Sequence, residues 1–448
     1  MTTTAVDLER RKFERIFAIV DSNKSGTIEQ DDFAQLADVV AEGRHWPLDG
    51  AEARALRQTL ISRFEHMRSV LDRNLDGVVT LAEWLRYNES HPPDETLDQI
   101  LEQTVFGAFA SDNNAGVHPA ILEALTRVNV GYAGAYGHDL ATRQAVATIR
   151  EHFGDCDPYF VFNGTAANVL GLRAVTSSWH SIVCAHTAHI VTDEAAAPEN
   201  YLGCKLILVH TPDGKLTVPL IERHRVRYDG IDRHNPTRVV SITNPTEYGT
   251  VYTPAEIRAI ADYCHANEIL LHLDGARIFN AAVATGATLR DLTSGAGVDV
   301  FSLGGTKNGM MMGEAILFFD RQLGKHFMYL QKQAMQTLSK MRFIAAQFHA
   351  LLKDGLWHRN ATQANDMAKL LGAGVAEIPG LELDQPVTAN GVFVRVPPHL
   401  IPRLESEAYF YVWDPARGVV RWMTSYDTTE EDVRCFLRLV RRIVEKAA

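Results

Sequence analysis

The chain has 448 residues, of which 46% are hydrophobic and 22% are charged, and its formal net charge is −11. This composition is typical of a folded globular protein and excludes a largely disordered one. No apolar stretch approaches the ~18 residues of a membrane-spanning helix, and the acidic balance argues against nucleic acid or an anionic membrane as a partner. The five cysteines show no CxxC spacing, and no secretory signal is visible, so we expect a cytoplasmic protein with reduced, mostly buried thiols.

The first hundred residues contain most of the acidic surplus. Residues 1–100 include 19 acidic and 12 basic side chains, a net charge of −7, against −4 for the other 348 residues. Apolar residues recur there at helical spacing on either side of two acidic loops that begin at Asp21 and Asp72. Paired prolines near residue 92 then indicate a linker. The pattern predicts a separate, all-α domain over residues 1–100.

Each acidic loop has the pattern of an EF-hand, with oxygen ligands at positions 1, 3, 5, 7, 9 and 12 and glycine at position 6. The predicted ligands are Asp21, Asn23, Ser25, Thr27, Glu29 and Asp32 in the first loop, and Asp72, Asn74, Asp76, Val78, Thr80 and Glu83 in the second. Ile28 and Val79 are typical of the short strands that pair two such loops. We expect calcium in both, with weaker binding or a preference for Mg²⁺ in the first, because Asp32 is one methylene shorter than glutamate. The alternative is a pair of solvated acidic turns.

From about residue 110 short apolar runs with strand character alternate with amphipathic helical stretches, such as residues 254–268. The predicted strands are 159–162, 181–184, 206–209, 238–243, 269–274 and 298–303. This alternation predicts an α/β domain with a mostly parallel sheet over 108–353. A long helical stretch near 321–353 leads to a region that mixes strands and helices, which predicts a smaller α+β domain over 354–448.

Three features of the α/β region point to one kind of chemistry. Lys307 follows a predicted strand among Gly304, Gly305 and Gly309, which we expect to leave room for a cofactor ring beside the amine. Asp274 ends a predicted parallel strand, where ligands bind such sheets, and could keep a pyridinium nitrogen protonated. Residues 162–170, FNGTAANVL, follow a strand and open a helix, so their N–H groups could bind a phosphate. Each feature is ambiguous alone, but together they are consistent with pyridoxal phosphate.

Eight blocks of sequence, in order and with matching spacing, resemble the low-specificity L-threonine aldolases. These are fold-type I pyridoxal phosphate enzymes of the β-eliminating lyase group. The resemblance covers about residues 108–448 and leaves the EF-hand region outside. The blocks are SDNNAGVHP (111–119), AYGHD (135–139), FNGTAAN (162–168), TAHIVTDE (187–194), TNPTEYGTVY (243–252), HLDGARIFNA (272–281), GGTKNGMMMGEAILFF (304–319) and RWMTSYDT (421–428).

The resemblance implies a role for each matching residue. Lys307 corresponds to the lysine that joins the cofactor covalently, Asp274 to the partner of the pyridine nitrogen and Arg277 to the arginine beside the ring hydroxyl. Gly164 and Thr165 correspond to the phosphate cradle, and His189 to the histidine stacked on the ring. Ser111 and Arg421 match groups that hold the substrate carboxylate. Tyr136 is expected to reach a neighbouring subunit's site, in a homodimer or homotetramer whose sites form at the dimer interface.

The implied reaction is retro-aldol cleavage of L-threonine, allo-threonine or a related β-hydroxy-α-amino acid to glycine and an aldehyde. His189 is the first choice for the base that removes the β-hydroxyl proton, and Glu247 is the second. One branch of the family has histidine at the position of Glu247, whereas other members have glutamate, as here. Three alternatives remain open: another reaction of the same cofactor, such as β-elimination or transamination; a different aldehyde acceptor in a biosynthetic pathway; and a calcium-binding protein on an inactive scaffold.

Overall fold

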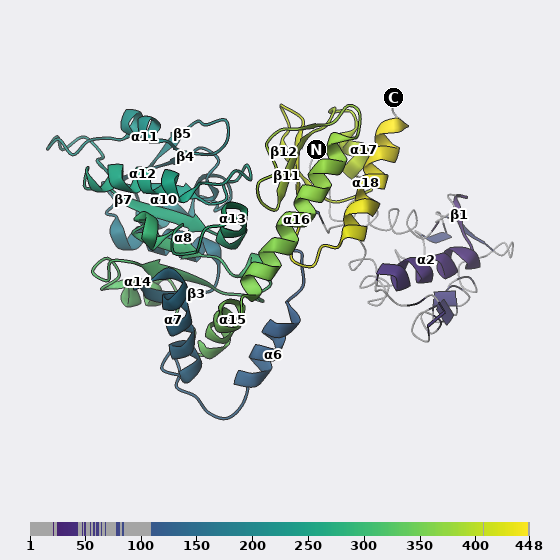
Figure 1. Cartoon of the computed structure of the whole chain (residues 1–448), viewed down its shortest axis with the longest axis horizontal. Helices are drawn as coiled ribbons and strands as arrows, with labels where there is room; N and C mark the ends of the chain where they lie inside the picture. Colours follow the sequence, from purple (N-terminus) through teal and green to yellow (C-terminus); the bar gives the residue numbers. More distant parts are fainter. Residues whose placement is uncertain are drawn as a thin grey trace. The chain divides into compact units, whose positions relative to one another are not determined.

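The computed structural model describes residues 21, 25–43, 47, 49–50, 54, 57–58, 60–61, 64, 68, 78–80, 83–84, 109–405 and 407–446. The chain divides into two compact units, Met1–Phe106 and Gly107–Ala448. Figure 1 shows both units, coloured along the sequence from purple at the N-terminus to yellow at the C-terminus. Across these described ranges, no helix combines the length and the apolar character needed to cross a membrane.

In the first unit, the two acidic loops meet through a short antiparallel ribbon. Strand β1 (Thr27–Ile28) pairs with β2 (Val79–Thr80), so that Ile28 lies opposite Val79 and Thr27 opposite Thr80. Ile28 and Val79 are fully buried. Helix α2 (Gln30–Gly43) follows the first loop. The predicted ligands Asn23, Asp72, Asn74 and Asp76 lie outside the described residues.

The second unit is built on a seven-stranded sheet in which every strand except β9 runs in the same direction. The order across the sheet is β3 (Asp157–Val161), β9 (Glu314–Phe318), β8 (Val300–Leu303), β7 (Leu270–Gly275), β6 (Thr237–Thr243), β4 (Ser181–Ala185) and β5 (Lys205–Val209). The prediction of a mostly parallel α/β sheet is confirmed, and each of the six predicted runs forms a strand. Strand β9 was not among them, although it is buried along its whole length.

Helices cover both faces of this sheet because alternate strand residues point to opposite sides. On one face Val240 and Leu271 pack in a cluster with α7 (Leu140–Phe153), α12 (Pro254–His265), α13 (Ile278–Thr285) and α15 (Arg342–Lys353). On the other face Val239 and Ile182 pack with α8 (Gly164–Val175), α10 (Ala197–Leu202) and α14 (Phe327–Gln333). Shorter or peripheral elements complete the layers: α6 (Pro119–Val128), α9 (His189–Thr192), α11 (Val218–His224) and the 3₁₀ turns η2 (Ser294–Ala296) and η3 (Thr306–Asn308).

The long helix predicted near 321–353 is instead two helices, α14 and α15, separated by residues 334–341. Met335 has φ of +62°, which ends α14 because a non-glycine residue in this region cannot continue a right-handed helix. The side chains of Gln331 and Gln336 tie the break to the end of β3, through Phe160 O at 2.6 Å and Phe162 N at 2.9 Å. These contacts between distant segments decide the break, and the helical periodicity of the sequence does not reveal them.

The C-terminal part forms a four-stranded antiparallel sheet in the order β10 (Glu382–Leu383), β11 (Gly391–Arg395), β13 (Val419–Met423) and β12 (Tyr411–Asp414). Helices α16 (Leu356–Ala376), α17 (Ile401–Glu405) and α18 (Glu430–Glu445) pack on it, and α16 also contacts α13 of the large layer (Figure 1). Phe109 belongs to this core, since its ring stacks on Phe436 at 4.5 Å. Residues 109–112 therefore link the small sheet to the site described below.

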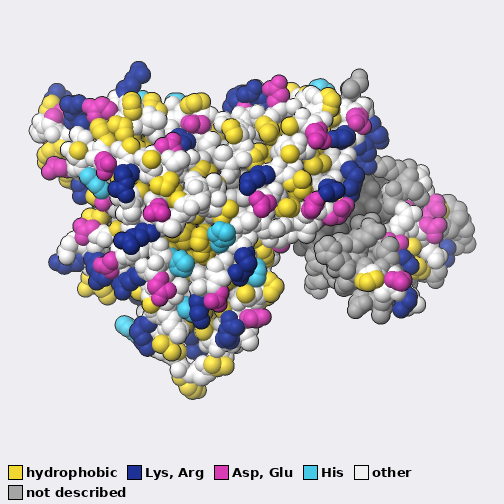
Figure 2. Space-filling model, viewed as in Figure 1, with side chains coloured by type: hydrophobic (Ala, Val, Ile, Leu, Met, Phe, Trp, Pro, Cys, Tyr) yellow, Lys and Arg dark blue, Asp and Glu magenta, His cyan; other side chains and the backbone are white. Residues whose placement is uncertain are grey.

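The face of the second unit seen in Figure 2 carries Lys, Arg, Asp and Glu side chains intermixed with apolar ones. Ion pairs such as Arg434–Glu430 and Arg438–Glu431 on α18 illustrate this mixing. All five cysteines are free, and Cys156, Cys184, Cys204 and Cys264 are buried.

Candidate active site

Asp274 lies at the carboxyl end of β7, near the middle of the large sheet, and only 5% of it is exposed. Its Oδ1 accepts the N–H of Ala276 at 2.9 Å, and its Oδ2 accepts the side-chain amide of Asn168 at 2.7 Å. The carboxyl ends of parallel strands are where such sheets bind ligands. Two fixed donors therefore hold this carboxylate at the base of a cavity of about 550 Å³.

Lys307 projects into the same cavity from η3, the turn that follows the neighbouring strand β8. The glycines around it also allow close packing of this turn. A Cβ on Gly304 would lie 2.5 Å from Ala276 O, and one on Gly305 would lie 2.3 Å from the sulfur of Met310. The glycines thus allow the turn that carries Lys307 to pack directly against the backbone that follows Asp274.

Electrostatics around Lys307 favour a neutral amine. Burial lowers the pKa of Lys307, and the nearby positive charge of Arg277 lowers it further. Glu314 on β9 holds the turn in place by accepting the N–H of Gly305 and the hydroxyl of Thr306, each at 2.7 Å. Burial raises the pKa of Glu314 to about 7. A buried amine with a lowered pKa is a good nucleophile towards a carbonyl group.

The first turn of helix α8 also lines this cavity. Asn163 caps the helix by accepting the N–H of Ala166 at 2.9 Å, and Gly164 and Thr165 form the first helical positions. The first N–H groups of a helix have no partner within it, and they attract anions. A Cβ on Gly164 would meet nothing within 4 Å, so the space beside this turn is open.

His189 lines this cavity, and Glu247, which contacts it, lines a second cavity that His189 also borders. The backbone N–H of His189 donates to Glu247 Oε1 at 2.9 Å, and its ring Nδ1 lies 2.9 Å from Glu194 Oε1. The hydrogen bond to Glu194 raises the pKa of His189 in spite of burial. Burial raises the pKa of Glu247 to about 7, and the charge of Asp274 adds to this rise. Glu247 can therefore exchange a proton near neutral pH, and His189 holds its proton more strongly than a free imidazole.

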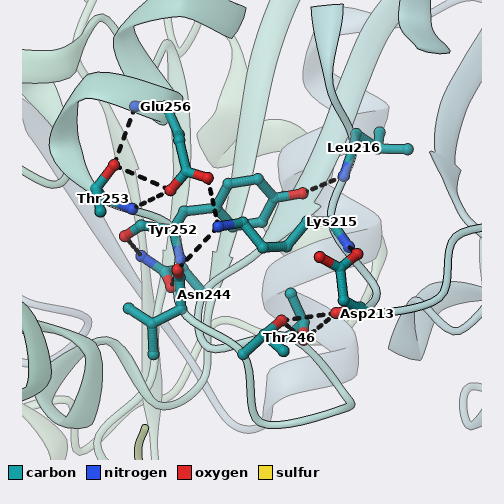
Figure 3. A network of polar contacts seen from close by, with 10 residues as sticks. Asp213, Lys215, Leu216, Asn244, Thr246, Tyr252, Thr253 and Glu256 are labelled. Atoms are coloured by element: carbon teal, nitrogen blue, oxygen red, sulfur yellow. Dashed lines mark hydrogen bonds and ion pairs between the residues drawn. The ribbon is translucent and has the colours of Figure 1, made fainter. Parts of the chain in front are cut away.

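The turn that carries Glu247 is fixed by a polar network (Figure 3). Thr246 Oγ1 donates to the carbonyl of Asp213 at 3.2 Å, and the Asn244 side chain bonds both backbone groups of Tyr252, at 3.0 and 3.2 Å. The Tyr252 hydroxyl accepts the N–H of Leu216, and Lys215 binds Glu256 and the carbonyl of Val251. Glu247 thus lies on a turn that hydrogen bonds fix on both sides, to Asp213 through Thr246 and to Tyr252 through Asn244.

A second cavity of about 210 Å³ adjoins the first, and His189 and Lys307 line both. Arg421 of β13 enters it, with its guanidinium 4.9 Å from the ring centre of Tyr411 and 4.7 Å from that of Trp413. Burial lowers the pKa of Arg421 to about 10. Its Nε is buried and has no hydrogen-bond partner within the described part of the chain. Such a donor fits the carboxylate of a ligand.

Arg277 lines the second cavity beside Arg421. It makes a two-point ion pair with Asp112, at 2.6 and 2.8 Å, and Asn390 donates to the same carboxylate at 3.0 Å. Burial alone would raise the pKa of Asp112, but the charge and hydrogen bonds of Arg277 hold it below its ordinary value. Ser111 precedes Asp112 and also lines this cavity. The first described residues of the second unit therefore orient Arg277.

Of the site residues expected from the sequence, the two cavities bring together Lys307, Asp274, His189, Gly164, Thr165, Glu247, Arg277, Ser111 and Arg421. Tyr136 lines neither cavity, is 54% exposed and has the ammonium of Lys332 5.3 Å from its ring centre. The sequence did not single out Asp112, Asn168, Glu194 or Glu314. All four lie inside the blocks that carry the resemblance, but nothing in their spacing indicates burial.

Comparisons with known proteins agree with this geometry. The family model described as beta-eliminating lyase matches residues 108–397. The chain belongs to this family. The lyase is 44% identical to the low specificity L-threonine aldolase of a Pseudomonas species, over 75% of this chain and 97% of that one. It is 30% identical to the threonine aldolase of Leishmania major, with a TM-score of 0.70 over 75% of this chain and 99% of that one. The match of the family model starts at residue 108, so the acidic loops lie outside it.

The lyase is a pyridoxal phosphate-dependent enzyme, and its residues fit that cofactor. The α8 N-terminus offers N–H groups for a phosphate, Lys307 a buried amine for the aldehyde and Asp274 a carboxylate for the ring nitrogen. When bound, pyridoxal phosphate supplies an electron sink for bond cleavage at an amino acid's α-carbon. The second cavity, with the open Nε of Arg421, lies where an amino acid's carboxylate can bind beside it.

Proposed function

We propose that the protein cleaves L-threonine, allo-threonine or a related β-hydroxy-α-amino acid to glycine and an aldehyde. The observation that carries this proposal is a pair of adjoining cavities, both of which are lined by His189 and Lys307. One cavity is suited to the cofactor, and the other contains the Nε–H of Arg421, which has no partner among the described residues. The named activity of the Pseudomonas and Leishmania relatives supports the choice of substrate.

In this proposal each residue of the site has its own role in binding the substrate or moving a proton. Arg421 and Ser111 bind the substrate carboxylate and so orient the bond between its α- and β-carbons. Lys307, with its lowered pKa, exchanges its amine with that of the substrate. His189 accepts the proton of the β-hydroxyl group, with Glu247 as the alternative acceptor. Arg277, held by Asp112, and Asp274 provide fixed charges beside the cofactor, which need no reorganisation during the reaction.

The test is an assay of purified, cofactor-loaded protein with L-threonine, with glycine and acetaldehyde both quantified. Lys307→Ala should lose the visible absorbance of the lysine-bound cofactor together with turnover. Release of ammonia or a keto acid without glycine would point to β-elimination or transamination instead. Near-normal threonine cleavage by Lys307→Ala would refute the role of this lysine.

We also propose a homodimer or homotetramer in the cytoplasm, with sites at its dimer interface. The exposure of Val130, Tyr132 and Tyr136, all more than half exposed on the loop between α6 and α7, supports the assembly. Exposed apolar patches of this kind mark association surfaces. Sedimentation of the wild type and of Tyr132→Asp should give a dimer or larger species that the variant weakens; a monomeric wild type would refute this assembly.

We also propose that the first unit binds calcium through paired EF-hand loops. The pairing of Ile28 with Val79 supports it, because these are the eighth positions of both loops. The Asp21 carboxylate accepts the N–H groups of Ser25 and Gly26, each at 2.9 Å, which curls the first loop. Within the described ranges, no group of three or more His, Cys, Asp or Glu side chains is arranged for a metal; four of the predicted ligands lie outside those ranges.

Calcium titration of chelator-treated protein tests this second proposal. Glu83→Gln should remove more binding than Asp32→Asn, because only glutamate has the reach for two-oxygen ligation at position 12. Magnesium competition should weaken calcium binding more at the first loop. Absence of calcium binding would refute the proposal. An activity that changes during the titration would indicate regulation, and an unchanged activity a structural ion.

A further inference from the structure

Behind His189 lies a connected row of buried polar side chains that the proposed reaction has not used. Asn168 of α8 donates from Nδ2 to Asp274 Oδ2 at 2.7 Å and to Glu194 Oε1 at 3.0 Å. The same Glu194 oxygen lies 2.9 Å from His189 Nδ1. Asn168, Glu194 and Asp274 are each at least 95% buried. The row therefore connects His189 to Asp274 within the protein interior.

Chemistry fixes the direction of the hydrogen bonds in this row. An ionised carboxylate only accepts, whereas a side-chain amide nitrogen carries two hydrogens. Asn168 can thus donate to Asp274 and to Glu194 Oε1 together only by pointing its nitrogen between them, which leaves its own Oδ1 and Glu194 Oε2 without a partner among the described residues. Glu194 must then receive a hydrogen from His189, which places the imidazole proton on Nδ1. The other ring nitrogen, Nε2, is left as the acceptor.

The backbone that follows Glu194 is in an unfavourable conformation. Ala195 and Ala196 have φ of +49° and +59°, a region that residues with a side chain adopt at a cost of roughly 1–3 kcal/mol each. These two residues turn the chain sharply between α9 and α10. The turn leaves Glu194 buried, whereas its neighbours Asp193 and Ala195 are exposed. Backbone strain of this kind is characteristic of functional sites.

We propose that Glu194, oriented by Asn168, is a positioning residue that holds the proton of His189 on Nδ1 and stabilises the charged imidazole after Nε2 accepts a proton. The role rests on the proposed aldolase function. The proton moves from the substrate hydroxyl to Nε2, its O–H electron pair stays on oxygen, and the Nδ1–H bond to Glu194 is kept. Glu194 would thus do for His189 what a buried carboxylate does for the histidine of a hydrolase triad.

The charges that face His189 bear on the pH dependence of this arrangement. The hydrogen bond to Glu194 raises the pKa of His189, burial lowers it, the charge of Asp274 raises it and that of Lys307 lowers it. Glu247 contacts the backbone N–H of His189. Removing the charge of Glu194 while keeping its shape should therefore lower the pKa of His189.

Glu194→Gln is the decisive variant, since its amide oxygen can still accept from His189 and Asn168. Glu194→Ala removes both bond and charge, and Glu199→Gln, at an exposed position of α10, is the matched control. In the loaded enzyme, we expect kcat to fall about tenfold in Glu194→Gln and about 100-fold in Glu194→Ala, within the range for loss of general-base support. The acid limb of kcat/KM should move to lower pH in Glu194→Gln, and Glu199→Gln should match the wild type.

A measurement without substrate separates this proposal from the aldolase assignment. In cofactor-free protein labelled with ¹⁵N-histidine, the signal of His189 is identified by its loss in His189→Gln. The wild type should show the Nδ1–H form, Glu194→Gln the same form with a lower pKa, and Glu194→Ala a mixture of both forms. An unchanged pKa in folded Glu194→Gln, or an Nε2–H form in the wild type, would overturn the proposal even if threonine is cleaved. If threonine is not cleaved but these NMR results hold, the substrate assignment alone fails.

Discussion

The clearest energetic consequence of the site concerns Glu247, whose pKa is raised from 4.5 to about 7 by burial and by the charge of Asp274. Each pKa unit corresponds to about 1.4 kcal/mol, so ionising this carboxyl in the folded protein costs roughly 3 kcal/mol more than in the unfolded chain. Below pH 4.5 both states hold the proton and nothing is lost. Between pH 4.5 and 7 the folded state holds more protons, so this group makes stability fall as pH rises, and the full cost applies above pH 7.

Glu247→Gln removes the ionisation but can keep the bond to the N–H of His189. We therefore expect the variant to gain stability over the wild type as pH rises, from near zero at pH 4 to about 3 kcal/mol at pH 8. The assay is denaturant unfolding of cofactor-free protein at several pH values. A difference between the two proteins that does not vary with pH would refute the reasoning.

Glu256 provides a control of opposite sign. Burial alone would raise its pKa, but its hydrogen bonds with Lys215 and Thr253 hold the pKa below the ordinary value (Figure 3). Its carboxylate therefore stabilises the folded state above pH 4.5, and that contribution is lost as pH falls. Glu256→Gln should destabilise the protein at pH 8 and have less effect at pH 4, the reverse of Glu247→Gln.

Two further substitutions test substrate anchoring and packing. Arg421→Ala should lower kcat/KM for L-threonine at least about tenfold, because a charged hydrogen bond to a carboxylate contributes about 1.5–3 kcal/mol. Arg421→Lys should recover only part of this loss. Unchanged kinetics in both variants would exclude the contact between Arg421 and the substrate. Gly304→Ala should destabilise the protein by about 1–3 kcal/mol, because its Cβ would lie 2.5 Å from Ala276 O. Gly116→Ala should leave stability unchanged, because a Cβ there would meet nothing within 4 Å. Equal stability of the two variants in thermal unfolding would contradict this prediction.

The sequence by itself determined the layered α/β fold and most of the residues that meet in the two cavities. Strand periodicity located six of the strands, and Lys307 and Asp274 could be placed because residues that follow parallel strands gather at one edge of a sheet. The same local pattern placed Ile28 opposite Val79. These features follow from spacings that recur along the sequence or from the fixed geometry of strand pairing, so the chain displays them directly.

Only the tertiary structure decided which polar groups are buried and what they contact. Asp112 reaches Arg277 across 165 residues, and Asn168 reaches Asp274 across 106, and neither separation leaves a periodic signal. The break between α14 and α15 and the packing role of Gly304 were likewise set by distant backbone. The pKa values of Glu247 and Lys307 follow from burial and from charges brought in by other elements. Burial is a property of the packed chain, and so the proton chemistry of the site emerges only when the layers have assembled.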